Sequence, residues 1–350
     1  MITAIDFGST EIRTACCDPQ RPGRLKLTTE RSAYTMIPDS KQHRAALDHF
    51  GFSYAVCDGS LVVAGNQASE AKWLSRVPMV PLLEDSSSDF ADPTARQLLS
   101  VMVEAMLPAC TTTGGICAVV LPGHESETGV MFRQRDFLCR LVKMRGYRIM
   151  KVRPSEAALL SAASPSVYSG CSVVIGAEFT EVCVAKNGSP QAFRFAAVGR
   201  NTIDRELARK FRMCVFDSDG TSYLNTDAVC EKIQSILSAS PDASDDFQHS
   251  LLGSCQLLAG QILTMVLEAI EESRILRMTR DHVTPLPLAL TGGGATTAGL
   301  KSALEQQITV QGVQDRIRIL DITPDTRTSV IRGALISAGL AAGSGAEIAA

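Results

Sequence analysis

The same strand–turn–strand pattern occurs twice in the sequence, once at its start and once near its middle. In the first copy, apolar residues 2–5 lead through Asp6 and Phe7 into a tight turn at residues 8–10, and apolar residues resume from Ile12. In the second copy, two apolar runs at residues 171–175 and 182–185 flank a turn at residues 176–180. Short apolar runs on both sides of a glycine-containing turn are typical of a β-hairpin. Two such units, each opening one half of the chain, predict an internally duplicated α/β fold.

Composition sets the limits of this prediction. The chain has 350 residues, which is about right for two domains, and a formal net charge of −3, which does not indicate a general nucleic-acid binder. The 11 cysteines are scattered without a Cys-x-x-Cys pair, as expected of reduced thiols in a cytosolic protein. Neither a signal peptide nor an apolar run long enough to cross a bilayer is expected. We therefore expect a cytoplasmic protein, which partners could attach to a membrane.

Other periodic segments predict the elements between the two hairpins. Helical spacing of apolar residues predicts a helix at about 94–107 and a basic amphipathic helix at about 128–145. The basic side chains of the second helix are expected to form a solvated face rather than a nucleic-acid contact. Asp58-Gly59 predicts a further hairpin turn, and the polar segment 84–95 is expected to be a loop. Most of the chain between the second hairpin and residue 288 is expected to be helical.

Three consecutive glycines, Gly292, Gly293 and Gly294, separate a short apolar run from a helical pattern. Glycines between a strand and a helix allow the backbone to approach a ligand closely, because no Cβ is in the way. The cluster matches neither the spaced dinucleotide-binding fingerprint nor the phosphate loop that ends in Gly-Lys-Ser/Thr. A nucleotide bound here would be held in another way.

Taken in order, these motifs resemble the superfamily of actin, the seventy-kilodalton heat-shock chaperones and the sugar kinases. Asp6-Phe7-Gly8-Ser9-Thr10 is similar to its first phosphate loop, residues 176–180 stand in the place of its second, and Gly292–Gly294 matches its adenosine loop. Three further segments resemble motifs that follow in these families: 198–207, 230–234 and 330–335. The resemblance covers residues 2 to about 339, and it is closest to MreB-type bacterial actins.

The resemblance implies a duplicated actin-like (ribonuclease H-like) fold of the α/β class, with two lobes and a nucleotide cleft between them. Lobe I would comprise residues 1–154 and 325–350, with a small subdomain inserted at about 25–75. Lobe II would comprise residues 155–324, with a small subdomain inserted at about 210–265. The length leaves no room for the peptide-binding domain of a full chaperone.

The resemblance also implies the site residues and the cofactors, ATP and Mg²⁺. Asp6 would orient Mg²⁺ through water and take part in catalysis. Backbone N–H groups in turns suit a polyanion, whose charge the metal offsets. The implied phosphate-binding residues are Gly8, Ser9, Thr10, Gly176 and Thr180. The implied adenosine-binding residues are Gly199, Glu231, Gln234, Gly292, Gly293 and Gly294.

The second phosphate loop departs from the family pattern at three positions. Val174 stands where the family has the aspartate that holds metal-bound water, and Glu178 and Phe179 replace small residues. A carboxylate facing a γ-phosphate is a like-charge penalty, and a bulky ring reduces the room for close approach. The three departures therefore predict that this loop supports ATP hydrolysis weakly or not at all.

A fourth departure lies in the helix that connects the lobes. Arg153 stands where chaperones and bacterial actins have the glutamate that positions the attacking water, and Glu156, one turn along, is the candidate substitute. Phosphoanhydride hydrolysis depends on positioned water and neutralised charge. Loss of general-base assistance alone reduces the rate by roughly 10²- to 10⁴-fold.

These observations favour an ATP-binding actin-fold protein with weak or absent hydrolysis, acting as a nucleotide-dependent switch or filament subunit in cell morphogenesis. Self-association into filaments or binding to a cytoskeletal or membrane-complex partner is expected; nucleic acid is not. The alternatives are a competent ATPase that polymerises like a bacterial actin and a stand-alone chaperone-type ATPase domain. A small-molecule kinase is more remote. Its candidate base would be Asp136, for which a salt bridge within the basic helix is the better interpretation.

Overall fold

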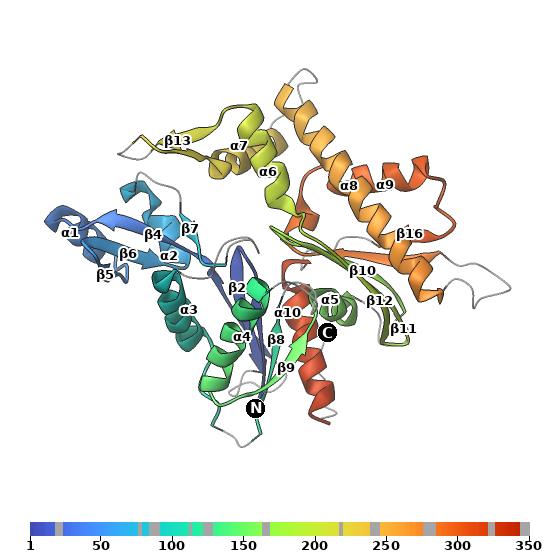
Figure 1. Cartoon of the computed structure of the whole chain (residues 1–350), viewed down its shortest axis with the longest axis horizontal. Coiled ribbons are helices and arrows are strands. Elements are labelled where there is room, and N and C mark those ends of the chain that lie inside the picture. Colours follow the sequence, from blue (N-terminus) through green and yellow to red (C-terminus); the bar gives the residue numbers. More distant parts are fainter. Residues whose placement is uncertain are drawn as a thin grey trace.

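Two five-stranded sheets with the same strand order form the framework of the chain (Figure 1). The computed structural model describes residues 1–17, 24–75, 79–83, 92–111, 114–121, 129–162, 169–216, 220–238, 246–275, 285–320 and 326–343. In each sheet, two antiparallel pairings on one side of a central strand are followed by two parallel pairings on the other. This repetition confirms the predicted internal duplication.

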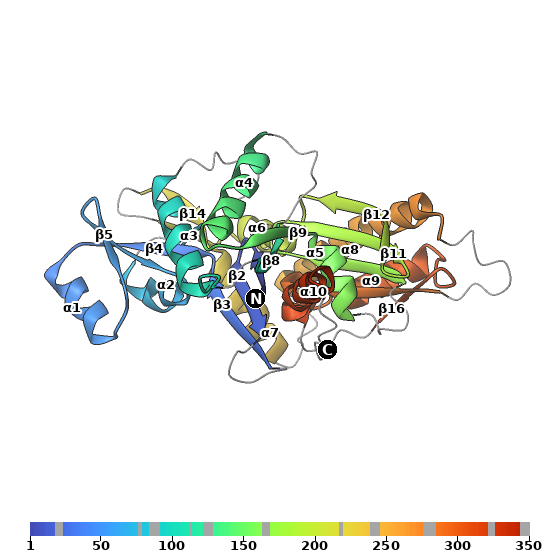
Figure 2. The same ribbon diagram turned by 90° about the horizontal axis from the view of Figure 1, so that it is seen from below.

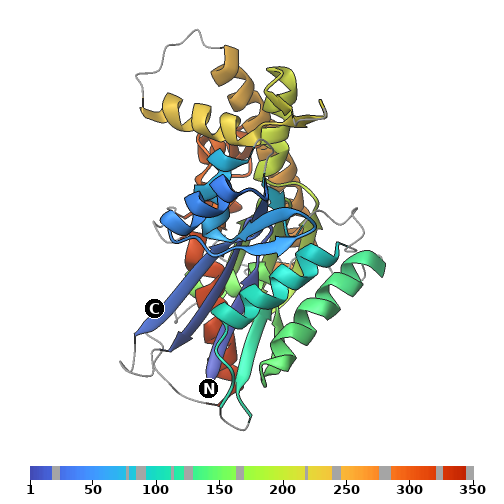
Figure 3. The same cartoon turned by 90° about the vertical axis from the view of Figure 1, so that its left-hand side faces the viewer.

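The first sheet has the order β3-β2-β1-β8-β9. Its strands are β1 (Ile2–Phe7), β2 (Glu11–Cys17), β3 (Leu25–Arg31), β8 (Ile116–Val120) and β9 (Arg148–Val152). Helices α3 (Pro93–Met106) and α4 (Gly129–Met144) pack their apolar residues against Ile5 and Phe7 on one face of this sheet (Figure 3). Because side chains alternate along a strand, Ala4 lies in a different cluster on the opposite face.

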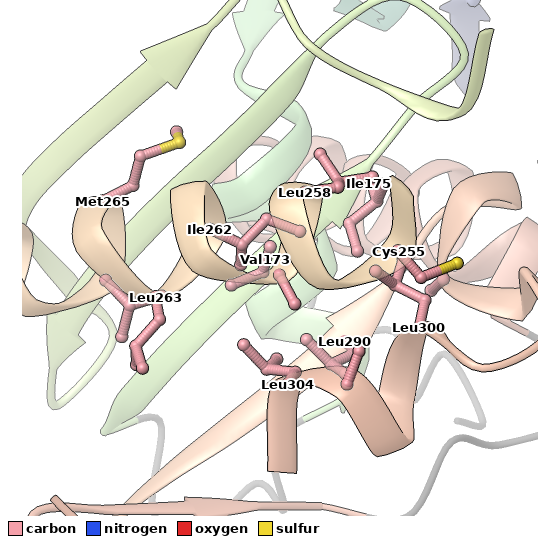
Figure 4. Packing of buried hydrophobic residues seen from close by; sticks show 14 of the residues in the cluster. Val173, Ile175, Cys255, Leu258, Ile262, Leu263, Met265, Leu290, Leu300 and Leu304 are labelled. Atoms are coloured by element: carbon pink, nitrogen blue, oxygen red, sulfur yellow. The ribbon is translucent and has the colours of Figure 1, made fainter. Parts of the chain in front are cut away.

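The second sheet has the order β12-β11-β10-β15-β16. Its strands are β10 (Gly170–Ile175), β11 (Thr180–Lys186), β12 (Ser189–Ala196), β15 (Leu286–Thr291) and β16 (Ile317–Ile319). Helices α8 (Asp246–Ser273) and α9 (Leu300–Val310) cover one face. Val173 and Ile175 of β10 belong to the same buried cluster as Leu258 and Ile262 of α8 (Figure 4).

Helices α5 (Pro154–Ala162) and α10 (Thr326–Ala341) lie between the two sheets (Figure 2). Their buried residues form one cluster with Ala4 and Ala118 of the first sheet and Val174 of the second. The two helices touch through backbone at Gly333, where a Cβ atom would lie 1.7 Å from the carbonyl oxygen of Ala157. Gly333, in the segment 330–335 that resembles a family motif, therefore permits close packing of α10 against α5.

Two smaller units extend from the sheets. The first contains the four-stranded sheet β5-β6-β4-β7 with helices α1 (Lys41–His49) and α2 (Asn66–Ala71) and the short helix η1 (Lys72–Leu74). Its strands are β4 (Ala33–Pro38), β5 (Ala55–Cys57), β6 (Ser60–Ala64) and β7 (Val80–Pro81). Strand β3, which falls within the expected insertion at 25–75, instead pairs with β2 in the first large sheet.

The second small unit contains α6 (Arg200–Lys210), the hairpin β13 (Cys214–Phe216) and β14 (Ser222–Leu224), and α7 (Thr226–Ser238). The β13–β14 hairpin was not predicted, because its three-residue strands are too short to show an apolar alternation. The predicted helices near 94–107 and 128–145 and the turn at Asp58-Gly59 are confirmed. In the expected loop 84–95, residues 84–91 lie outside the described residues, and α3 begins at Pro93.

Helix α8 corrects one expectation, because it is long and apolar enough, by length and composition, to cross a membrane. Half of its most apolar window is buried inside the protein. The buried face packs on β10 and β11, which is the usual arrangement of a core helix. The sequence did not reveal this long apolar helix, because Ser254, Gln256 and Gln261 interrupt the run of apolar residues.

Candidate functional site

The turns of the two equivalent hairpins have the same backbone geometry. In the β1–β2 turn, the N–H of Gly8 donates to the carbonyl of Glu11 (3.2 Å); in the β10–β11 turn, the N–H of Gly176 donates to the carbonyl of Phe179 (2.8 Å). A Cβ atom on Gly8 or Gly176 would lie 2.7 or 3.0 Å from that acceptor oxygen. The glycines are thus required by the close approach within each turn, as expected for both phosphate loops.

Each turn presents backbone donors that the protein does not use. Across the part of the chain that the structure describes, no group accepts a hydrogen bond from the N–H groups of Ser9, Thr10, Ala177 or Glu178. Successive N–H groups in a turn form a concavity that favours an anion. Both turns could therefore hold phosphate oxygens through their backbones.

The strands that lead into the two turns differ in charge. Asp6 lies opposite Arg13 in β2, with 3.4 Å between Oδ2 and Nη1, and Arg13 also pairs with Glu11. Burial raises the pKa of Asp6, and the guanidinium of Arg13 opposes that rise. At the equivalent position of the second hairpin, Val174 packs in the apolar cluster between the sheets. Only the first hairpin therefore retains an acidic side chain at this position.

Glu178 does not extend freely from the second turn. Its carboxylate accepts hydrogen bonds from Asn201 Nδ2 (2.7 Å) and from Arg205 Nη1 (3.1 Å) and Nη2 (2.8 Å). The side chain is only 11% exposed, and the two-pronged pairing with arginine is among the stronger kinds of charge-assisted hydrogen bond. The negative charge anticipated from the sequence is present, but α6 holds and compensates it.

Sequence reasoning did not identify Asn201 and Arg205. The available signal was their spacing of four residues, which places both on one face of a helix next to the turn. Phe179, the second bulky residue of the loop, packs its ring against Phe195 of β12, with 5.1 Å between centroids. The ring therefore contacts the neighbouring strand.

Thr180 and Gly199 connect the second turn to α6. The Thr180 hydroxyl is buried and donates to the carbonyl of Val198 (2.7 Å), so it has a structural partner. A Cβ on Gly199 would lie 2.5 Å from the carbonyl oxygen of Ala177. The first N–H groups of α6, from Arg200 and Asn201, donate to the carbonyls of Gly176 and Ala177. Thr180 and Gly199 thus hold the β10–β11 turn against the start of α6.

The triple-glycine segment also packs on the second turn. Gly292 has a φ of +87°, and a Cβ there would lie 2.4 Å from the carbonyl oxygen of Ile175. A Cβ on Gly294 would lie 2.5 Å from Ile175 Cγ2, whereas Gly293 faces open space. The structure therefore brings Gly176, Gly199, Gly292 and Gly294 together.

Glu231 and Gln234 lie on exposed positions of α7. Glu231 faces the other small unit, where Lys72 Nζ lies 3.6 Å from Glu231 Oε1 and 3.8 Å from Asp227 Oδ2. Arg31 Nη2 lies 4.0 Å from Asp227 Oδ1. Among these inter-unit ion pairs (Arg31, Lys72, Asp227 and Glu231), those of Lys72 join the two small units, whereas that of Arg31 joins the end of β3 in the first large sheet to α7. Each pair is exposed and contributes little by itself.

A hydrogen bond from Cys230 joins α7 to an ion pair within α6, between Arg200 and Asp204. Asp204 is 3% exposed, accepts a hydrogen bond from Cys230 Sγ (3.6 Å) and lies 3.3 Å from Arg200 Nε. Burial raises the pKa of Asp204, and Arg200 opposes the rise. The segment 198–207, which resembles a family motif, therefore positions the helix that carries Glu231.

Arg153 and Glu156 lie at the start of α5, on the side of β11 and β12. The Arg153 guanidinium lies 4.2 Å from the centroid of the Phe193 ring. Burial raises the pKa of Glu156, and nearby Arg153 lowers it. Buried Glu181 accepts hydrogen bonds from the N–H (3.1 Å) and hydroxyl of Ser155 and so caps the helix. The described contacts do not place Glu156 beside either turn, and its catalytic role remains a prediction.

The Mg²⁺ expected from the sequence would be held by Asp6 through water, and this site stays a prediction. Within the described ranges, no group of three or more His, Cys, Asp or Glu side chains could hold a metal ion directly. Asp6 is paired with Arg13, and Val174 offers no oxygen. The residues present therefore do not fit a directly bound metal.

Solved structures show the class to which this fold belongs. A non-polymerising mutant of MamK bound to AMPPNP matches 96% of this chain and 98% of its own, with 17% identity and a TM-score of 0.50. MreB5 of Spiroplasma citri bound to ADP matches 95% and 94%, with 16% identity and a TM-score of 0.58. The ethanolamine utilization protein EutJ from Carboxydothermus hydrogenoformans matches 96% and 89%, with 13% identity and a TM-score of 0.51.

The chain thus has the two-lobe fold of the actin-like ATPases, as the resemblance implied. The model of the Volactin family matches residues 1–338, and the chain belongs to that family. No curated protein matches the sequence.

Proposed function

We propose that the chain binds an adenine nucleotide between its two hairpin turns and acts as a nucleotide-dependent switch or a filament subunit with weak or absent hydrolysis. The observation that carries the proposal is the pair of matching turns with unused N–H groups at Ser9, Thr10, Ala177 and Glu178. Two structures of MreB5 of Spiroplasma citri are bound to ADP and AMPPNP, which supports a nucleotide as the ligand of this fold.

The first turn would hold phosphate oxygens through residues 8–10, and the second through residues 176–178. The tightly packed Gly292 and Gly294 would fix the adenosine side of the site, where Gly293 leaves open space. Glu231 and Gln234 would approach the nucleoside from α7. A bound ATP would supply the phosphoanhydride, and the chain's own contribution would be binding and orientation.

Weak hydrolysis follows from the side chains around the second turn. Val174 cannot hold a metal-bound water, and Arg153 packs on Phe193 instead of presenting a base. Because phosphoryl transfer to water requires a positioned nucleophile and neutralised charge, binding without rapid turnover is expected. The working context we propose is the cytoplasm, in cell morphogenesis, with filament partners or a cytoskeletal or membrane-complex protein.

The proposal is tested by thermal shift with ADP and ATP, with and without Mg²⁺, together with phosphate release. Ligand binding to the folded state should raise the melting temperature. Phosphate release should be at least about 100-fold slower than the median enzyme turnover of about 10 s⁻¹. Rapid release that Asp6→Ala abolishes, but that Asp136→Ala on exposed α4 leaves unchanged, would contradict weak hydrolysis. Failure of every nucleotide to bind would contradict the switch itself.

Filament formation is tested separately by pelleting and negative-stain microscopy with each nucleotide. We expect a pelletable polymer whose amount depends on the nucleotide. If the protein stays monomeric at high concentration under all conditions, the filament role is contradicted. The role as a nucleotide-dependent switch would still stand.

The inter-unit ion pairs lead to a prediction about nucleotide release. Lys72→Glu should place like charges beside Asp227 and Glu231 and speed release by about two- to fivefold at low salt, because surface pairs are each worth up to about 1 kcal/mol. Stopped-flow release of a fluorescent ADP analogue would measure the rate. The effect should disappear at about 0.5 M salt, which screens exposed charges. Adding Asp227→Lys should restore slow release, and Lys41→Glu on α1 is the matched control.

A further inference from the structure

We propose that Glu178 makes the phosphate site selective for a nucleoside diphosphate over a nucleoside triphosphate. The inference rests on the proposed nucleotide site and names the phosphate state that the site accepts. It starts from Glu178, an acidic side chain in the β10–β11 turn, whose backbone offers hydrogen-bond donors. Glu178 occupies the turn position that Thr10 occupies in the first hairpin, since Gly8 and Gly176 are equivalent.

The first step is that the Glu178 carboxylate has a fixed position. Arg205 binds both of its oxygens and Asn201 binds one, with distances of 2.7 to 3.1 Å. The side chain of Glu178 is 11% exposed. Moving it away would break three charge-assisted hydrogen bonds, so it cannot withdraw readily when a ligand arrives.

The second step is that Arg205, whose side chain is 36% exposed, is already paired with Glu178. Its guanidinium presents two N–H groups to Glu178, so its positive charge is already compensated within α6 and the turn. A γ-phosphate would bring additional negative charge toward a carboxylate without gaining a free cation. Like charges at short range repel strongly where water is partly excluded.

The third step concerns the other groups that could offset a triphosphate. Val174 is apolar and 9% exposed, and Asp6 is engaged with Arg13. At this pair of equivalent positions, the side chain that would recruit a neutralising metal is therefore apolar on lobe II and paired with arginine on lobe I. The backbone N–H groups of the turns remain, and they suit the smaller charge of a diphosphate.

The fourth step is that the turn cannot easily rearrange to accept a larger anion. Its carbonyls accept from the first two N–H groups of α6, and Phe179 is packed on Phe195. Gly199 and Gly292 approach the same backbone so closely that added methyl groups would collide with it. Glu178 therefore acts from a rigid position and determines specificity by charge.

The test is calorimetric titration of the full chain with ADP and with ATP, each in EDTA and in Mg²⁺. We expect ADP to bind about tenfold more tightly than ATP, a difference that corresponds to one strongly unfavourable charge contact. Glu178→Gln keeps the shape and removes the charge, and should tighten ATP binding by about tenfold while changing ADP binding less than about threefold. Glu272→Gln is the matched control, because Glu272 pairs with Arg194 away from the turn.

A second variant makes the test independent of the stability of the first. Arg205→Gln should leave the Glu178 charge uncompensated and increase the preference for ADP, so the two variants should shift the ATP-to-ADP ratio in opposite directions. Circular dichroism melting would check that each variant is folded. Tighter binding of ATP than ADP by the unmodified chain, or an unchanged ratio in both variants, would overturn the inference while preserving nucleotide binding. Absence of any nucleotide binding would overturn the proposed function and the inference together.

Discussion

Replacing Gly333 with alanine should destabilise the folded chain by about 3 kcal/mol, which is the upper part of the range for overpacking in a tight interior. The added Cβ would lie 1.7 Å from the carbonyl oxygen of Ala157, and 2.4 Å from the carbonyl carbon. The nearest atoms are backbone, so no side-chain rotation can make room, and α5 and α10 must separate. The midpoint of urea unfolding, followed by circular dichroism, would report the loss.

The matched control is Gly260→Ala in α8. A Cβ at Gly260 meets no atom within 4 Å, and alanine is favoured over glycine in a helix by about 1 kcal/mol. The control should therefore be neutral or stabilising. Equal unfolding midpoints for Gly333→Ala and Gly260→Ala would contradict the close helix crossing.

The second large effect is expected at Gly292. Alanine there would have to adopt a φ near +87° and place its Cβ 2.4 Å from the carbonyl oxygen of Ile175. Strain from the left-handed backbone and displacement of the turn together should destabilise the protein by about 2–3 kcal/mol. The shifted turn should also weaken ADP binding by more than about tenfold, measured by calorimetry well below the melting temperature.

Gly293→Ala provides a neighbouring control. Gly293 has no atom within 4 Å of an added Cβ, and its φ lies outside the left-handed region. Stability should change little. Any loss of ADP binding would then mean that the added methyl group fills space that the ligand occupies. If Gly292→Ala bound ADP normally, the glycine cluster would not support the site.

The fold could be predicted because its signal is repeated. Apolar strand pairs around glycine turns occur at the start of both halves, and the structure gives both halves the same sheet order. The resemblance extended this to the two-lobe class. The β13–β14 hairpin and the membrane-like apolarity of α8 were missed, because strands of three residues and interrupted apolar faces carry little periodic signal.

The site could be predicted only in part. The glycines of both turns were found because close backbone approach demands that residue type. The partners of Glu178 were not found, because a pairing with Arg205 depends on how α6 packs against the turn. The same holds for Lys72 and Glu231, which are distant in sequence and meet only across the two small units. Single charges in a sequence do not reveal which other charge compensates them.

The backbone contact between α5 and α10 has a mechanical consequence. The point at which the two helix backbones touch, at Gly333 and Ala157, can serve as a pivot, and displacement about a pivot grows with distance from it. The hairpin turns lie close to the centre, whereas the four-stranded sheet and the β13–β14 hairpin lie at the periphery (Figure 1). A small rocking of one lobe would therefore part the small units widely while hardly separating the turns. The distance between spectroscopic labels on α1 and α7 would therefore change more than the distance between the turns. Such labels would report lobe motions that are too small to follow at the turns themselves.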